Sequence, residues 1–458
     1  MFYRRLRIHT VAVFLAVLCL LFSAPAGAAD APAAEIRNSV TVSVSGGQFG
    51  GMLRDGYRYT HLVLSAGVEI TITSETAFSA IYLIWDRPPA AWILETDSLP
   101  PAEIDSGFMH EAVTMQTAVN EAVISLGRSE YILCEIYLFT EGRLPAWVQL
   151  WQPSLDLADL LLLPAQAGDE HLFFGGILPL YAGERGLNVQ VAYMTAHQNE
   201  RERPHELLDG LWEVGVTAYP LFGPFENTDS TQESPAAESV RSRENVAKYQ
   251  TELLRRLKPF VAVGPDLSGE YGNGAQILCA SALSDALELA ADSKCPFGLD
   301  DYGIWDTPKA YLHLYPENEI VLDFDAPLER FGGAAAYKKA LDGFAKHVTQ
   351  KAHFPLMQNE APENFRSFGL FRTTVGPDEL GGDLFENIVF ERITEPEPEQ
   401  SPIPLPTAVT SADPPEQKGD DISNNATRPP LFYALCVLCA VAVILVFSFL
   451  IRSSRRKK

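Results

Sequence analysis

Apolar and polar residues alternate along the first part of the chain, between about 36 and 152. The alternation marks strand candidates at 40–45, 68–72, 132–139 and 147–151. A period of two places every apolar side chain on one face of a strand. The pattern predicts an all-β domain over 36–152, a sandwich of the jelly-roll or discoidin-like kind. Its aromatic side chains are expected either to fill the core or to line a sugar-binding face: Tyr57, Tyr59, Tyr82, Trp85 and Trp92.

The pattern changes after residue 152, where short apolar runs alternate with segments of helical period. Expected strands lie at 157–163, 189–194 and 260–263, and expected helices at 206–214, 244–257 and 277–291. Strand–loop–helix repetition favours an α/β domain with a mainly parallel sheet over 153–393. In such domains ligands bind in the loops that follow the carboxyl ends of the strands.

Apolar runs near both ends of the chain predict export and anchoring. Residues 1–29 combine early arginines, a short apolar run and an Ala-rich end, as in a signal peptide cleaved within 26–29. The uncharged segment 431–451 is long enough to cross a ~30 Å hydrocarbon core, and the basic segment 452–458 predicts a cytoplasmic tail. The Pro- and Glu-rich segment 394–430 is expected to be a disordered stalk. Together they predict a single-pass cell-membrane protein with an extracellular ectodomain.

The net charge limits the classes of binding partner, and the number of cysteines limits the possible disulfide bonds. The formal net charge of −24 argues against nucleic acid and against anionic lipid head groups. The cysteines outside the predicted end segments are Cys134, Cys279 and Cys295, too few for a disulfide framework. Their spacing leaves a Cys279–Cys295 bridge open.

One segment of the α/β region carries the motif on which the functional hypothesis depends. Residues 163–171 read LPAQAGDEH and lie between a buried strand and a helix. The segment resembles the (A/P)HPDDE motif of the PIG-L family of zinc-dependent de-N-acetylases. Five further segments resemble this family: 173–176, 203–207, 269–276, 311–315 and 368–370. The resemblance implies a Rossmann-like fold and, in active members, hydrolysis of N-acetylglucosamine-type substrates.

The chain departs from this family at the residues that carry the chemistry. In the family, the motif His, its second Asp and a distant His bind zinc, and these positions hold Gln166, Asp169 and Gln276 here. Gly168 stands at the general-base position, and Asn273 replaces another His. Neutral amides are weak zinc donors, and water without zinc is a poor nucleophile. We therefore expect no zinc cofactor and no catalytic residue at this place, although active relatives use Zn.

The leading hypothesis is a catalytically inactive homologue that binds a cell-envelope carbohydrate or a protein partner. Candidate substrate-binding residues are the polar and aromatic side chains around the motif: Asp169, Glu170, Arg203, Asp266, Glu270 and Tyr271. One alternative is an active zinc-dependent de-N-acetylase whose metal site has moved to His197, His205 and Asp169. Another is a structural or adhesion ectodomain that binds through its β domain. His171 is expected to point away from Asp169 along the new helix.

Overall fold

The computed structural model describes residues 31–47, 49–195, 197, 200–225, 243–351 and 363–391. The expected signal peptide, stalk, apolar span and basic tail lie outside these residues and stay predictions. Of the helices that are described, none is long and apolar enough to cross a membrane. The β part and the α/β part of the chain belong to one compact unit that ends at Glu391.

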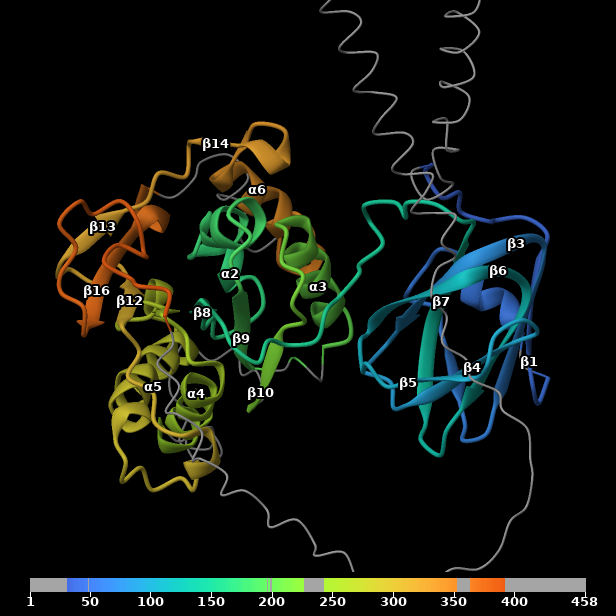
Figure 1. Cartoon of the computed structure of the whole chain (residues 1–458), viewed down its shortest axis with the longest axis horizontal. Helices are drawn as coiled ribbons and strands as arrows, with labels where there is room; N and C mark the ends of the chain where they lie inside the picture. The colour runs from blue at the N-terminus through green and yellow to red at the C-terminus, as the bar shows by residue number, and fades with distance from the viewer. Residues whose placement is uncertain are drawn as a thin grey trace, which may run out of the picture. The chain divides into compact units, whose positions relative to one another are not determined.

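The first part of the chain is all β, as the alternation predicts. Its strands are β1 (Val40–Val44), β2 (Leu62–Leu64), β3 (Glu69–Trp85), β4 (Trp92–Thr96), β5 (Ala102–Ile104), β6 (His110–Leu126) and β7 (Tyr131–Phe139). Antiparallel ladders join them in the order β2-β7-β3-β6-β4-β5, with β1 beside β3 (Figure 1). The long strands β3 and β6 pair with different neighbours along their length, so the ladders form one continuous sheet instead of two separate ones.

The expected strand at 147–151 does not form. This segment has no ladder partner, and it covers the outer face of β3 and β7 instead. The ring of Trp147 lies 5.8 Å from that of Tyr82 and 5.1 Å from that of Tyr137. Alternating apolar residues here serve to cover a neighbouring sheet, a use that a period of two does not distinguish from a strand.

The second part is an α/β layer structure. Its strands are β8 (Leu160–Leu162), β9 (Val189–Thr195), β10 (Leu221–Phe225), β11 (Val261–Gly264), β12 (Lys309–His313), β13 (Glu319–Val321), β14 (Pro327–Leu328), β15 (Ala334–Ala335) and β16 (Ser367–Thr373). Its helices are α2 (Asp169–Leu172), α3 (Arg203–Glu213), α4 (Arg243–Leu257), α5 (Gly274–Ala291), α6 (Ala336–Phe344) and α7 (Val348–Lys351), with a π-helix at Leu178–Glu184.

The main sheet of this part has the order β10-β9-β8-β11-β12-β16-β13, and the first five strands are parallel. Alternate residues of β8 face opposite cores. Leu160 and Leu162 pack in a core shared with α3, whereas Leu161 packs in a core shared with α4 and α5. Burial on both faces explains the continuous apolar run of this strand. The predicted mainly parallel α/β fold is confirmed.

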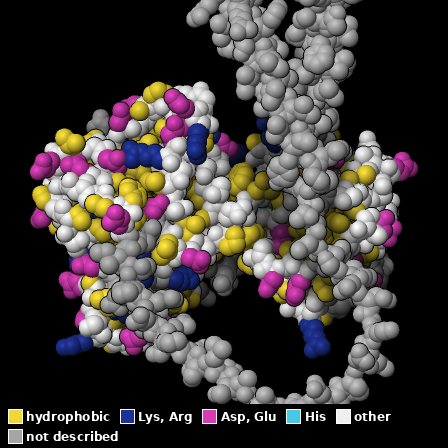
Figure 2. All heavy atoms as spheres, in the orientation of Figure 1, with side chains coloured by type: hydrophobic (Ala, Val, Ile, Leu, Met, Phe, Trp, Pro, Cys, Tyr) yellow, Lys and Arg dark blue, Asp and Glu magenta, His cyan; other side chains and the backbone are white. Residues whose placement is uncertain are grey.

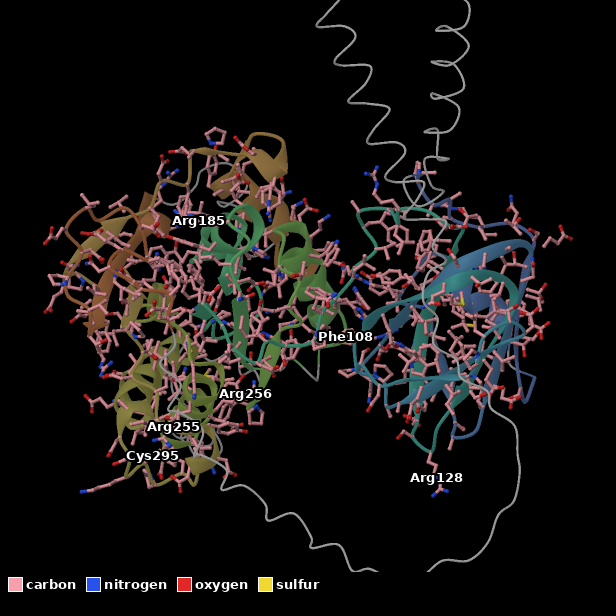
Figure 3. All side chains as sticks on the ribbon, viewed as in Figure 1. Phe108, Arg128, Arg185, Arg255, Arg256 and Cys295 are labelled. Atoms are coloured by element: carbon pink, nitrogen blue, oxygen red, sulfur yellow. The ribbon has the colours of Figure 1, made fainter. Side chains whose placement is uncertain are left out.

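The cysteine pairing left open by the sequence does not occur. Cys134, Cys279 and Cys295 are all free and buried (Cys295 is labelled in Figure 3). Burial raises the pKa of the Cys134 thiol to about 11, so this thiol is protonated at neutral pH. These cysteines therefore act as small apolar core residues.

The surface agrees with the acidic composition. Acidic side chains are spread over the visible face and do not gather in one patch (Figure 2). Scattered carboxylates of this kind are solvated individually and mark no single binding site.

Candidate functional site

Three neighbouring strand ends bring the motif residues together. Asp169 follows β8 at the start of α2, Glu270 lies in the loop after β11, and β12 ends at His313. Gln276 is in the first turn of α5, which follows the same β11 loop. Because β8, β11 and β12 are parallel, their carboxyl ends meet at one edge of the sheet, as the sequence predicts.

Hydrogen bonds link these side chains into one buried network. Nε2 of Gln276 donates to Oδ1 of Asp169 at 3.0 Å, and Oε1 of Gln276 accepts from the backbone N–H of Glu270 at 2.8 Å. The second oxygen of Asp169 accepts from the backbone N–H of Gln166 at 3.1 Å. Oε1 of Glu270 lies 2.6 Å from Nδ1 of His313. The Gln276 amide thus joins two loops that the family's zinc ion would join.

The donor set does not fit a zinc ion. Gln166 and Gln276 offer neutral amides, and both ends of the Gln276 amide are already hydrogen-bonded. Catalytic zinc sites use imidazole, thiolate or carboxylate ligands and keep one position open. Burial raises the pKa of the Asp169 carboxyl to about 8, although the hydrogen bond from Gln276 acts in the opposite direction. No step of zinc hydrolysis is assigned to these residues.

Gly168 and Asn273 have local structural roles. Gly168 has a φ of 100°, and a Cβ there would lie 2.4 Å from Oε1 of Gln350. An aspartate at this general-base position would therefore strain the backbone, because side chains other than glycine rarely adopt this φ. Asn273 caps helix α5, because its Oδ1 accepts from the backbone N–H of Ala275 at 3.0 Å.

The alternative metal site of His197, His205 and Asp169 is not assembled. Nε2 of His197 accepts from the backbone N–H of Ala167 at 2.9 Å, which braces the motif loop. Nδ1 of His205 lies 2.8 Å from Nε2 of His110, a residue of the β part. Among the described residues, the groups of three close metal-ligand side chains do not include Asp169.

The remaining candidate residues divide into buried supports and one exposed side chain. Nη2 of Arg203 donates to a motif-loop carbonyl at 2.8 Å, and the backbone N–H of Asp266 donates to Glu270 at 3.3 Å. Glu170 is fully buried, and its Oε2 accepts from the backbone of the motif loop at 2.7 Å. Tyr271 is 86% exposed and has a φ of 56°, a strained value for a non-glycine residue.

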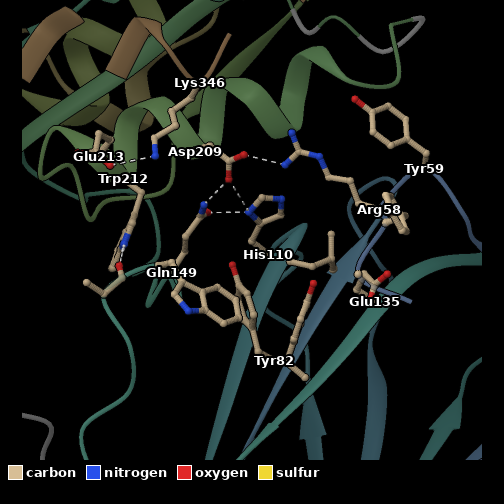
Figure 4. A pocket seen from close by; sticks show the side chains of 16 residues that line it. Arg58, Tyr59, Tyr82, His110, Glu135, Gln149, Asp209, Trp212, Glu213 and Lys346 are labelled. Atoms are coloured by element: carbon tan, nitrogen blue, oxygen red, sulfur yellow. Dashed lines mark hydrogen bonds and ion pairs between the residues drawn. The ribbon is translucent and has the colours of Figure 1, made fainter. Parts of the chain in front are cut away.

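A pocket of about 710 Å³ lies between α3 and the β part (Figure 4). Aromatic faces and polar groups alternate along its wall. Its lining side chains include Tyr57, Arg58, Tyr59, Tyr82, His110, Glu135, Tyr137, Trp147, Gln149, Asp209, Trp212, Glu213 and Lys346. The sequence reasoning missed this pocket because its walls come from segments far apart in the chain.

Asp209 is the polar centre of this pocket. Its carboxylate accepts from Nη1 of Arg58 and from Nε2 of Gln149, each at 2.7 Å (Figure 4). Oε1 of Gln149 lies 2.7 Å from Nδ1 of His110. Burial lowers the pKa of His110 to about 4, so this imidazole is neutral at pH 7. The pocket therefore offers fixed donors and acceptors beside aromatic rings.

The predicted aromatic residues fall into two groups. All three tyrosines line the pocket, and two of them, Tyr57 and Tyr59, are 66% and 57% exposed. Trp85 and Trp92 lie in the core, where both indole N–H groups donate to Glu111 at 2.9 Å. Those two tryptophans are core residues and take no part in a binding face.

The α/β and β parts also meet beyond the pocket. Phe108 of the β part stacks on Tyr219 with ring centroids 4.6 Å apart, and the backbone N–H of Met109 donates to the Tyr219 hydroxyl at 3.1 Å (Figure 3). Arg201 pairs with Asp86 across the same boundary. These contacts fix the pocket walls relative to each other.

Comparisons with known proteins give distant relatives. No protein-family model matches the chain. It is 32% identical over 126 residues to 1D-myo-inositol 2-acetamido-2-deoxy-alpha-D-glucopyranoside deacetylase 2 of Saccharopolyspora erythraea, covering 26% of this chain and 45% of the relative. It is 26% identical over 186 residues to 1D-myo-inositol 2-acetamido-2-deoxy-alpha-D-glucopyranoside deacetylase 1 of Catenulispora acidiphila, covering 35% of this chain and 57% of the relative. The chain thus spans about half the length of these relatives.

Solved structures that resemble the chain include N,N'-diacetylchitobiose deacetylase from Pyrococcus horikoshii, with 14% identity, a TM-score of 0.34, and coverage of 47% of this chain and 84% of that one. A pectin-binding carbohydrate-binding module resembles it with 14% identity, a TM-score of 0.19, and coverage of 24% and 98%. The motif segments, the parallel sheet that carries them and the curated relatives agree. These findings support a PIG-L-family deacetylase fold for the α/β part of this chain, at a distant level of similarity.

Proposed function

We propose that this chain is a catalytically inactive PIG-L-like protein that binds a carbohydrate. The observation that carries the proposal is the position of Gln276. Its amide bridges Asp169 and Glu270 with hydrogen bonds of 3.0 and 2.8 Å, where active relatives would place a zinc ion. The bridge keeps the two loops together without a metal, so the fold survives and the hydrolytic chemistry does not.

Without the metal, neither the attacking water nor the carbonyl of the substrate is activated. Zinc lowers the pKa of its bound water toward 7 and polarises the acyl carbonyl of the substrate. A general base contributes roughly 100- to 10,000-fold to the rate of proton transfer, and Gly168 has no side chain to act as one. Without the zinc ion and the general base, an unactivated water would have to attack an amide carbonyl.

The pocket around Asp209 supports the binding half of the proposal. A sugar ring has an apolar C–H face that packs on aromatic rings, and Tyr57, Tyr59 and Trp147 present such rings. Its hydroxyl groups need donors and acceptors in fixed positions, which Asp209 and Arg58 provide through their 2.7 Å contact. A pocket of about 710 Å³ accommodates a mono- or disaccharide.

The predicted anchor completes the proposal. Segment 431–451 would hold the binding unit at a cell membrane, with the stalk 394–430 as a spacer. A carbohydrate of the cell envelope would then lie within reach of the pocket.

The test combines a deacetylase assay with a binding assay on the purified full-length chain. We expect no acetate release from N-acetylglucosamine-containing oligosaccharides, with or without added zinc. We expect glycan-array signal that is lost in Asp209→Ala and Trp147→Ala and kept in Glu130→Gln, an exposed β-part control. Acetate release that disappears in Asp169→Ala would show an active enzyme instead. A signal unaffected by both pocket variants would exclude this pocket.

A further inference from the structure

A second polar cluster lies directly behind the motif loop. Glu170 and His171 belong to α2, and His347 follows α6; all three side chains are fully buried. Oε1 of Glu170 is 3.5 Å from Nε2 of His171 and 3.3 Å from Nε2 of His347. The two imidazole rings meet edge to face, with centroids 5.4 Å apart. The sequence predicts that His171 points away from Asp169, and its contacts with Glu170 and His347 are consistent with that prediction.

Five polar atoms of this cluster lack hydrogen bonds. Within the described part of the chain, Oε1 of Glu170 and both ring nitrogens of His171 and of His347 have no hydrogen-bond partner. A buried polar atom without a partner costs about 1–3 kcal/mol, and native proteins rarely leave several of them in one place. Imidazole and carboxylate normally approach to about 2.7–2.9 Å when they pair directly. The observed separations of 3.5 and 3.3 Å are longer than this.

The separations match the edges of a tetrahedron around a transition metal. Ligand atoms about 2.0–2.1 Å from a tetrahedral zinc lie roughly 3.3–3.4 Å from one another. Two imidazole nitrogens and one carboxylate oxygen are also a ligand set that Zn²⁺ uses in proteins. We propose that Glu170, His171 and His347 bind a structural divalent metal ion of the zinc class, distinct from the lost zinc site at Gln166, Asp169 and Gln276.

Gly210 lets helix α3 approach both imidazole rings closely. It lies in the interior of α3, where glycine costs up to about 1 kcal/mol relative to alanine. A Cβ at Gly210 would lie 2.6 Å from Nε2 of His171 and 3.0 Å from Nε2 of His347. The same point would be 3.1 Å from the carbonyl oxygen of Gly343. A side chain at position 210 would therefore clash with both Nε2 atoms, which lie close together against this face of α3.

The other group of close ligand-type residues does not share these properties. Asp86, Cys134 and His205 also lie near one another. There, Arg201 pairs with Asp86 and contacts the Cys134 sulfur at 3.7 Å, while His205 pairs with His110 at 2.8 Å. A guanidinium cation already occupies that position, so a metal is not needed there.

The proposed ion would tie α2 to the segment after α6 and to the wall formed by α3. Because the ligands are fully buried, no substrate reaches it, and its role is to hold the motif loop in place. The inference does not depend on carbohydrate binding or on the absence of hydrolysis.

The test is metal analysis of the purified full-length chain after loading with zinc sulfate and dialysis. We expect about one zinc per chain, a loss of at least tenfold in Glu170→Gln and in His347→Gln, and full retention in Asp169→Asn. Circular dichroism would show whether each variant is folded. Wild-type protein without bound zinc, or folded variants that keep it, would overturn the proposal.

A second measurement uses only the unchanged chain, in case the variants do not fold. X-ray absorption at the zinc edge should show nitrogen and oxygen ligands at about 2.0–2.1 Å, including two imidazoles. A sulfur ligand at about 2.3 Å would be incompatible with this ligand set and overturn the assignment. Cobalt loaded in place of zinc should give the visible spectrum of tetrahedral coordination, and an octahedral spectrum would contradict the proposed geometry.

Discussion

Two buried polar clusters on either side of the motif loop differ in how completely they are paired. In the cluster of Asp169, Gln276 and Glu270, hydrogen bonds of 2.8–3.1 Å connect the side chains to one another and to the backbone of the two loops. In the cluster of Glu170, His171 and His347 the closest separations are 3.3 and 3.5 Å. The comparison shows that the first cluster is connected by its own hydrogen bonds, whereas the second cluster keeps ligand-type atoms without hydrogen-bond partners, which is the basis of the proposed metal site.

The largest effect should come from removing the metal of the second cluster. A ligand bound at a thousand times its Kd stabilises the folded state by about 4 kcal/mol. Dialysis against a chelator should therefore lower the melting temperature by roughly 8–16 °C, at about 2–4 °C per kcal/mol. Thermal unfolding followed by circular dichroism measures this shift.

The matched control for chelation is His347→Gln, which should melt at the lower temperature with or without chelator. If the melting temperature of the wild-type protein is the same before and after chelation, the proposed difference between the two clusters is wrong.

The first cluster should respond strongly to loss of its bridging amide. Gln276→Ala leaves Oδ1 of Asp169 and the backbone N–H of Glu270 without their partners. We expect a loss of about 2–4 kcal/mol in the free energy of unfolding, because each buried unpaired group costs about 1–3 kcal/mol. Denaturant titration is the measurement. Glu288→Ala, on the exposed face of the same helix, should change stability by less than about 0.5 kcal/mol.

Restoring imidazole to the first cluster should separate metal binding from catalysis. The double variant Gln166→His, Gln276→His is expected to bind a second zinc per chain, because it regains two ligand types beside Asp169. Hydrolysis should remain at least about 100-fold below that of an active deacetylase, since Gly168 supplies no base. Zinc content and acetate release are measured on the same sample. Rapid acetate release would mean that another residue can act as the base.

A further effect concerns the pocket, and it appears as a pH dependence. Burial and the neighbouring Asp55 raise the pKa of Glu135 from 4.5 to about 8. The folded state then holds a proton that the unfolded state releases, so this residue's contribution to stability is lost as pH rises from about 4.5 to 8. Glu135→Gln should flatten this slope in denaturant titrations, and the exposed Glu130→Gln should leave it unchanged.

The sequence predicts the α/β layer well because its signals are local. The short apolar run before the motif becomes β8, and the expected helix at 277–291 becomes α5 at Gly274–Ala291. The gathering of Asp169 and Glu270 at one sheet edge also follows from parallel strand order. Such features depend on period and on short connections, which a sequence displays directly.

What the sequence could not predict depends on distant contacts. His347 is far from Glu170 along the chain, and nothing near it marks it as a ligand. The pocket likewise joins Arg58 to Asp209, residues of different structural parts. Gly210 within α3 was an available signal, because a glycine inside an amphipathic helix usually has a packing reason.

Helix α3 contributes to all three places at once. Its first residue, Arg203, holds the motif loop, Asp209 centres the pocket, and Gly210 leaves room beside the two imidazoles. In a deep mutational scan, the positions of this helix that tolerate no substitution should therefore depend on the property under selection. Selection for glycan capture should select against changes at Asp209, whereas selection for folding alone should select against a side chain at Gly210. Different positions of one short helix would thus be constrained by the motif loop, by the carbohydrate pocket and by the metal site.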